Sequence, residues 1–129
     1  MVWSCLVSIL PGMAQTEKLT DYVNPFVGTD GYGNVYPGAQ IPFGGIQISP
    51  DTDSRFYDAA SGYKYNHLTL MGFSLTHLSG TGIPDLGDFL FIPGTGEMKL
   101  EPGTHEDPDQ GYRSRYSHDK EWASPNYYA

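Results

Sequence analysis

The sequence predicts an all-β protein whose antiparallel strands stack as a β-sandwich. Its 129 residues include 16 glycines and 10 prolines, and this many helix breakers leave little room for long helices. No segment combines helix caps with an apolar period of about 3.6 residues. Short apolar runs of strand length alternate instead with loops rich in turn-forming residues. The length fits one domain at most.

The charge of the chain excludes nucleic acid as a partner. The formal net charge is -8, whereas a nucleic-acid partner requires a basic face. Calcium or a neutral polar ligand is compatible with this charge, and so is a purely solubilising role. The single cysteine, Cys5, excludes an intrachain disulfide.

The first 14 residues resemble part of an export signal. The apolar run 2–10 is too short to cross a bilayer as a helix, so we expect no membrane span. Ala14 stands before Gln15 as the small residue of a cleavage site, although the positively charged start of a signal is absent. We expect residues 1–14 to be a signal-peptide remnant, with a functionless N-terminus as the alternative. Residues 15–129 are then the folded part of an exported protein, periplasmic or extracellular.

The glycine-rich stretch 24–39 is predicted to be a long loop. Neither a lysine nor a helix follows its glycines, so it is not a phosphate-binding motif. Asp30 and Asn34 either accept hydrogen bonds from ligand hydroxyls or cap the turn itself. A strand is predicted over 42–49, where isoleucines alternate with polar or small residues.

Two apolar runs predict the larger strands. Residues 67–76 form one predicted strand that becomes polar toward its end, which directs His77 outward at the rim of the sheet. The uninterrupted apolar run 89–92 predicts a central strand. Shorter strands are expected at 97–100, 112–117 and 127–129. Because the sequence stops inside the last of these, we expect the chain to be incomplete.

The loop between the two larger strands, residues 77–88, is a candidate ligand-facing segment. It carries one imidazole, two hydroxyls, two carboxylates and three glycines, more polar groups than a turn requires. Glycine also lets the backbone approach a ligand closely. The alternative is a structural turn whose side chains satisfy their own backbone. The substrate-binding residues predicted in this loop are His77, Ser79, Gly80, Thr81, Gly82, Asp85 and Asp88.

Tyr57 and Asp58 form a second candidate site, in the polar loop 52–61. A sugar can place its apolar face against an aromatic ring while a neighbouring carboxylate accepts hydrogen bonds from its hydroxyls. The alternative is that Tyr57 anchors this loop onto the core.

Several kinds of catalytic site do not match the sequence. The histidines lie at 67, 77, 105 and 118, which is not the spacing of a zinc site. Ser79 lacks the Gly-x-Ser-x-Gly context of a nucleophile elbow. Asp85 and Asp88 are a weak candidate for the two carboxylates of glycoside hydrolysis, because residues three apart in a turn more often cap the loop.

A series of short motifs runs through most of the chain, and the run from Thr76 to Gly82 is its most specific part. In order and spacing the series resembles the N-terminal domain of glycoside hydrolase family 92, the calcium-dependent exo-acting α-mannosidases, mostly bacterial and exported. The motifs are Val23-Asn24-Pro25-Phe26-Val27-Gly28-Thr29, Tyr36-Pro37-Gly38-Ala39, Pro42-Phe43-Gly44, Ser49-Pro50-Asp51-Thr52, Ser61-Gly62-Tyr63, Gly72-Phe73-Ser74, Thr76-His77-Leu78-Ser79-Gly80-Thr81-Gly82 and Asp85-Leu86-Gly87-Asp88.

The resemblance implies a galactose-mutarotase-like β-sandwich, incomplete here, that precedes an (α/α)6-barrel domain absent from this chain. It implies inversion at the anomeric carbon, with the Glu acid and the Asp base in that barrel domain. The calcium cofactor is likewise bound mainly by the missing domain. We therefore expect no catalytic residue and no metal ligand in this chain. The loops 57–58 and 77–88 would form one wall of the active-site cleft.

The sequence departs from the family pattern at a few positions. Tyr32 and Asn34 stand in the glycine-rich loop where family members often carry histidines, and many members carry a Trp near Tyr57. A different aromatic residue near Tyr57 would alter which sugar occupies the leaving-group subsite, and with it the linkage that the enzyme prefers. Asn126 stands where Gly is usual, and Asn tolerates a positive φ, so we expect that turn to survive.

Two functions follow as hypotheses. In the first, the chain is an N-terminal fragment of an exported inverting α-mannosidase of the α-1,2 type, which removes terminal mannose from glycans. The fragment alone is then expected to be inactive, because the proton donor and the base belong to the missing domain. The alternative is a free-standing carbohydrate-binding or adhesion module.

Overall fold

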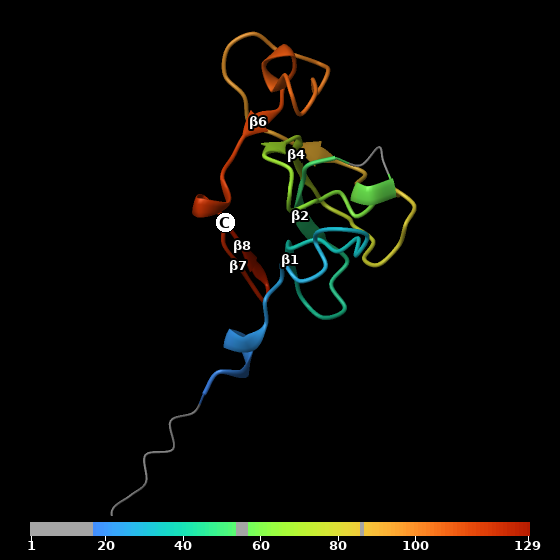
Figure 1. Cartoon of the computed structure of the whole chain (residues 1–129), viewed down its shortest axis with the longest axis vertical. Helices are drawn as coiled ribbons and strands as arrows, with labels where there is room; N and C mark the ends of the chain where they lie inside the picture. The colour runs from blue at the N-terminus through green and yellow to red at the C-terminus, as the bar shows by residue number, and fades with distance from the viewer. Residues whose placement is uncertain (1–16, 54–56, 86) are drawn as a thin grey trace, which may run out of the picture.

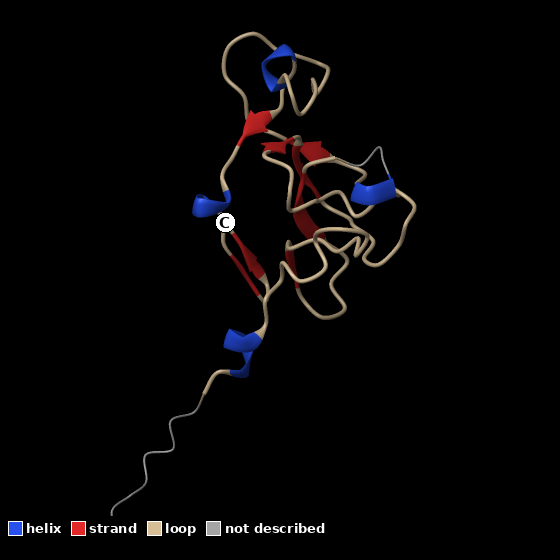
Figure 2. Ribbon diagram, viewed as in Figure 1, coloured by secondary structure: helices blue, strands red, loops and turns tan. Residues whose placement is uncertain are grey.

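The computed structural model describes residues 17–53, 57–85 and 87–129, so the predicted signal-peptide remnant, 1–14, lies outside the described residues. Within these ranges the protein consists of short strands, short 3₁₀ helices and long loops (Figure 2). The strands are β1 (Ala39–Gln40), β2 (Gln47–Asp51), β3 (Thr69–Leu70), β4 (Gly72–Ser74), β5 (Leu90–Phe91), β6 (Ser114–Arg115), β7 (Ala123–Ser124) and β8 (Tyr127–Tyr128). The 3₁₀ helices are η1 (Leu19–Tyr22), η2 (Tyr57–Ala59), η3 (Pro108–Gln110) and η4 (His118–Lys120).

Every strand pair in the described chain is antiparallel, which confirms the all-β prediction. The main sheet has the order β1-β2-β4-β5, with Ser49 opposite Ser74 and Phe73 opposite Phe91. A second small sheet joins β3 to β6, and β7 with β8 forms a hairpin near the C-terminus (Figure 1). Asn126 in the turn of this hairpin has φ +67°, so the expected positive-φ turn is confirmed.

The predicted strand 67–76 is wrong as one continuous element. It divides at Met71 into β3, which pairs with β6, and β4, which pairs with β2 and β5. Gly72 makes the division possible, because its φ is +154° and a Cβ there would lie 2.7 Å from the carbonyl oxygen of Phe91. The Met71 N–H donates to the Asp51 carbonyl at 2.7 Å. One apolar run therefore serves two sheets.

Other predicted strands are corrected in position or length. The run 89–92 was expected to be central, but its strand, β5, lies at an edge of the main sheet, and Phe91 is 58% exposed. An apolar run indicates a surface that favours burial and does not fix the place of a strand in a sheet. Residues 97–100 form no strand, and the predicted strand 112–117 is reduced to β6.

The predicted strand 42–49 begins only at Gln47, and its orientation is unexpected. Ile46 and Ile48 are exposed, whereas Ser49 and Asp51 are 1% and 4% exposed. The polar side chains of β2 therefore face the interior. Because buried polar groups require hydrogen-bond partners, this face of the strand determines which side chains pack against it.

The interior is small and mostly polar. The buried hydrophobic residues are Ala59, Ala60, Tyr63 and Met71. The buried polar or charged residues are Thr29, Asn34, Ser49, Asp51, Thr52, Asp53, Ser61, Lys64, Thr69, Ser74, His77 and Arg113. Hydrogen bonding among buried side chains is therefore prominent in holding these loops together.

One such network attaches the C-terminal segment to the body of the molecule. The Tyr63 hydroxyl donates to both oxygens of Glu121, at 2.9 and 3.0 Å. Tyr128 and the Nδ1 of His118 donate to the same carboxylate. Burial, together with the Glu121 charge, raises the pKa of Tyr63 and of Tyr128 well above the ordinary value, so both remain donors.

A second network holds the segment 101–113 against the body. The His67 and His105 rings lie 4.0 Å apart, and His105 Nε2 is 3.3 Å from Asp53 Oδ2. Arg113 also lies 3.5 Å from that oxygen. Burial, and then the charge of His105, lower the pKa of His67 to about 4, while burial and Arg113 lower that of His105. Both rings are therefore neutral at pH 7.

Replacing Tyr63 by Phe should lower the free energy of unfolding by about 2 kcal/mol, because a hydrogen bond to a charged group is lost while the ring is kept. Urea denaturation measures this loss. The matched control is Tyr127→Phe, since the Tyr127 side chain is 52% exposed, and a change within about 0.5 kcal/mol is expected there. Equal effects of the two substitutions would contradict the role of the Glu121 network.

The free energy of unfolding should fall as the pH falls from about 6.5 to about 4. In this window the unfolded chain binds a proton at His67 that the folded state does not, because the pKa is about 4 when folded and 6.5 in the reference state. Denaturation at pH 7 and pH 5 measures the change. His67→Gln should make the pH dependence shallower, and an unchanged slope would refute the assignment.

Candidate functional site

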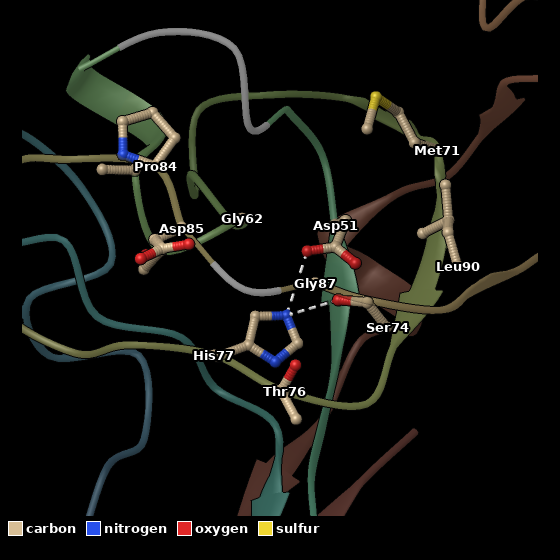
Figure 3. A pocket seen from close by; sticks show the side chains of 12 residues that line it. Asp51, Gly62, Met71, Ser74, Thr76, His77, Pro84, Asp85, Gly87 and Leu90 are labelled. Atoms are coloured by element: carbon tan, nitrogen blue, oxygen red, sulfur yellow. Dashed lines mark hydrogen bonds and ion pairs between the residues drawn. The ribbon is translucent and has the colours of Figure 1, made fainter.

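The loop 77–88 joins β4 to β5, and its first residue is fixed at the main sheet. The His77 side chain is buried, with Nδ1 2.7 Å from the Gln47 carbonyl oxygen. Its Nε2 lies 3.0 Å from both Asp51 Oδ1 and Ser74 Oγ (Figure 3). The prediction that His77 is directed outward at the rim is therefore wrong. The polar inner face of β2 offers acceptors to both ring nitrogens, and these hold the ring inside.

The contact with Gln47 shows that Nδ1 of His77 carries a proton. A carbonyl oxygen only accepts hydrogen bonds, so Nδ1 of His77 donates to Gln47. Nε2 of the same ring lies within hydrogen-bond distance of both Asp51 Oδ1 and Ser74 Oγ. The three side chains are not a nucleophilic triad, since the hydroxyl of Ser74 and the carboxylate share one ring nitrogen.

Gly62 leaves the space in which this pair forms. Its φ is +90°, and a Cβ there would lie 2.0 Å from Asp51 Oδ1 and 3.2 Å from the His77 ring. The backbone of Gly62 also accepts a hydrogen bond from Thr52 N at 2.7 Å. The loop 59–62 is therefore packed directly on the buried pair.

A cavity of about 320 Å³ lies beside the main sheet, bordered by residues 60–62 and by Pro84, Asp85 and Gly87. The buried pair of Asp51 and His77 is part of its wall, and Asp85 lies at another side (Figure 3). The remaining lining residues are Ala60, Ser61, Gly62, Met71, Ser74, Thr76, Pro84, Gly87 and Leu90.

The two predicted loops meet on the outer surface. A Cβ at Gly82 would lie 2.2 Å from the Tyr57 ring, so this ring packs directly against the glycine backbone. Tyr57 remains 61% exposed, and its ring centroid is 5.9 Å from that of Tyr32, which is 77% exposed. Tyr57 therefore packs on Gly82 and still exposes most of its side chain, beside a second exposed tyrosine.

Asp58 lies next to this aromatic pair and is held by a lysine. Lys64 Nζ is 3.1 Å from Asp58 Oδ2 and also donates to the carbonyls of Asp58 and Gly31. The Lys64 side chain is buried, whereas that of Asp58 is 47% exposed. Lys64 Nζ also lies 5.8 Å from the centre of the Tyr32 ring. A buried cation therefore fixes an exposed carboxylate beside two exposed rings.

Other predicted loop residues take part in the turn itself. Thr81 donates to the Ile83 carbonyl at 3.2 Å, and Asp88 accepts from Thr76 at 3.0 Å. Gly80 N donates to the Asn34 carbonyl at 2.6 Å, and Ser79 is exposed. These contacts agree with the structural-turn alternative for part of the loop.

The glycine-rich loop uses its polar side chains in the same way. Asp30 accepts from Gly31 N at 2.8 Å, and Asn34 Oδ1 accepts from Ala60 N at 3.2 Å. Asp30 therefore caps its own turn, as in the capping alternative, whereas Asn34 joins the glycine-rich loop to the backbone of residue 60.

Sequence reasoning missed three members of the site: Tyr32, Asp51 and Lys64. The sequence could have identified Asp51, because polar residues alternate at positions 47, 49 and 51. Tyr32 joins the site through its contact with Tyr57, 25 residues later, and Lys64 joins it through Asp58, six residues earlier. Across the described residues, no group of three or more His, Cys, Asp or Glu side chains is arranged to hold a metal ion.

Comparison with known proteins identifies the family. Residues 22–129 match the model of the glycosyl hydrolase family 92 N-terminal domain. The chain belongs to this family. The family 92 chain is similar to the solved structure of the gh92 family glycosyl hydrolase ccman5, with a TM-score of 0.67 and 36% sequence identity. This similarity covers 84% of the present chain and 14% of that chain. The neighbour supports an incomplete β-sandwich.

A second relative is a protein of Arthroderma benhamiae described as an uncharacterized secreted glycosidase. It is 36% identical over 73 residues, which are 56% of the family 92 chain and 9% of the relative. The chain therefore spans a small part of the length of both relatives. In the described residues, none of the helices has the length and apolar character needed to cross a membrane.

Replacing Gly62 by Ala in this family 92 domain should lower the free energy of unfolding by about 2–4 kcal/mol, because the added methyl group strains the backbone and collides with Asp51. Gly45→Ala is the matched control, since a Cβ there meets nothing within 4 Å. Thermal or urea denaturation compares the two variants. Similar stabilities would show that the buried pair does not depend on Gly62.

Proposed function

We propose that the chain forms one wall of the active-site cleft in an exported, inverting α-mannosidase that removes α-1,2-linked terminal mannose from glycans. Family membership establishes the class of glycosyl hydrolase. The observation that carries the finer proposal is the meeting of Tyr57 with Gly82, which joins the two predicted loops on one surface. The secreted description of the relative supports export to the periplasm or the outside of the cell.

The surface has the chemistry that a sugar ring requires. The exposed faces of Tyr57 and Tyr32 offer apolar area to the C–H face of a pyranose. The Asp58 carboxylate, fixed by Lys64, accepts hydrogen bonds from hydroxyls at the edge of the ring. Because Lys64 neutralises this carboxylate, the surface suits a neutral ligand better than a cation.

We assign the catalytic acid and base to a part of the enzyme outside this chain. Inversion requires a carboxylic acid and a carboxylate about 6.5–9.5 Å apart on opposite sides of the sugar. We place both groups in an (α/α)6 domain of the same enzyme. In this proposal that domain is the partner of the present chain. We place the calcium in that domain as well.

Replacing Tyr57 by Ala should weaken binding of α-1,2-mannobiose by up to about tenfold, because the stacking surface for one sugar ring is removed. Titration followed by NMR measures the dissociation constant with the wild-type chain and the variant. The control is Tyr127→Ala, which removes an exposed tyrosine from β8 and should leave the constant unchanged.

Two results would contradict the proposal. Equal binding by the wild type and Tyr57→Ala would show that this surface does not hold the sugar. Release of mannose by the chain alone, with or without calcium, would place the catalytic groups within it. Binding that prefers another linkage would refute only the α-1,2 assignment.

A further inference from the structure

Asn34 lies where three segments of the candidate sugar surface meet. Tyr32 belongs to the same glycine-rich loop as Asn34, Tyr57 begins the helix η2, and Gly82 belongs to the loop 77–88. Asn34 itself is only 6% exposed, whereas both tyrosines are mostly exposed. It can therefore act on this surface from within the protein and not by contact with a ligand.

Asn34 holds the other two segments through two different groups. Its side-chain Oδ1 accepts a hydrogen bond from Ala60 N at 3.2 Å, and Ala60 directly follows the helix that carries Tyr57. Its main-chain carbonyl accepts from Gly80 N at 2.6 Å, two residues before Gly82. One residue therefore ties both loops of the candidate surface to the glycine-rich loop.

Two other contacts of the glycine-rich loop reach a different part of the chain. The carbonyls of Thr29 and Gly31 accept hydrogen bonds from residues 64–65, at 2.9 and 3.1 Å. These donors do not belong to the loop 77–88, to which Asn34 is bonded. The contacts of Asn34 therefore have a separate effect, because they fix the two loops relative to each other.

The backbone conformation of Asn34 limits which residue types can make these contacts. Its φ is +49°, in the left-handed region where Asn is enriched and β-branched residues are outliers. Glycine adopts this conformation easily but has no side-chain acceptor. Asn supplies both the conformation and the acceptor.

The segments that Asn34 joins carry the two exposed rings. The ring centroids of Tyr32 and Tyr57 are 5.9 Å apart, and Asn34 Nδ2 lies 3.5 Å from the Tyr32 carbonyl oxygen. Ligand-binding side chains on loops keep a fixed geometry only when hydrogen bonds behind them hold the loops, and a surface held in this way binds more tightly. The buried contacts of Asn34 meet this requirement.

We propose that Asn34 is a positioning residue, which holds Tyr32 and Tyr57 at the spacing at which both rings contact a sugar. The role of the rings in sugar binding rests on the proposed function. The spacing of the rings is a property of the free chain and can be tested without a sugar.

Asn34→Gly tests this role, because it keeps the backbone conformation and the carbonyl while it removes Oδ1. In the free chain, the nuclear Overhauser effect between the Tyr32 and Tyr57 rings should weaken. The dissociation constant for α-1,2-mannobiose should rise by up to about fivefold, since one buried hydrogen bond that fixes the surface is lost.

Two control variants separate positioning from a general loss of stability. Asn126→Gly makes the same change at another positive φ, +67°, in the turn of the β7–β8 hairpin. Tyr63→Phe removes a hydrogen bond to Glu121 in the network of the C-terminal segment. Both controls should leave the ring-to-ring effect and the dissociation constant unchanged.

A double-mutant cycle tests whether Asn34 acts through Tyr57. In the Tyr57→Ala background, Asn34→Gly should change the dissociation constant by less than about twofold, because the ring that it positions is already absent. Additive effects in this cycle, an unchanged ring-to-ring effect in Asn34→Gly, or equal weakening by either control would overturn the proposal. If the wild type does not bind mannobiose, the cleft proposal fails, and the ring-to-ring effect alone decides whether Asn34 positions this surface.

Discussion

The hydrogen bonds of the His77 ring connect the parts of this molecule that carry its candidate function. Through Nδ1 and Nε2 the ring joins the Gln47 and Asp51 ends of β2 to Ser74 on β4. The loop 77–88 begins at this ring, and the loop 59–62 packs on the same pair through Gly62. The buried contacts of this ring therefore set the position of both loops, because an unpaired ring or carboxylate in the interior would be costly.

The same reliance on buried polar contacts recurs elsewhere in the domain. A chain of this length with few buried hydrophobic residues gains less from burial of apolar surface than a larger domain does. Glu121 compensates at the C-terminal segment by accepting from two tyrosines and a histidine. Asp53 and Arg113 do so beside β3 and β6. Such networks specify one arrangement, since every donor must meet its acceptor.

The two sides of the 77–88 loop have different chemistry. Its outer side, where Gly82 meets Tyr57, is aromatic and exposed. Its inner side is a cavity with a buried carboxylate in its wall. The loop therefore borders an exposed aromatic surface and a cavity, and its glycine at 82 allows the Tyr57 ring to pack against the backbone.

Local patterns determined much of the fold class. The abundance of Gly and Pro and the short apolar runs were sufficient to predict antiparallel strands, and the polar composition of residues 77–88 identified the loop that borders both surfaces. The ordered motifs were sufficient to identify the family. These features are local, so they can be read from neighbouring residues.

Only the tertiary structure decided the direction of His77, the division of the strand at Met71 and the edge position of β5. Each depends on contacts between segments far apart in the chain: His77 faces inward because Asp51, 26 residues earlier, offers it an acceptor. Tyr32 joins the site through a contact of the same long-range kind, with Tyr57. An alternating pattern shows that a strand has two faces, but which face is buried depends on the partners that the rest of the chain supplies.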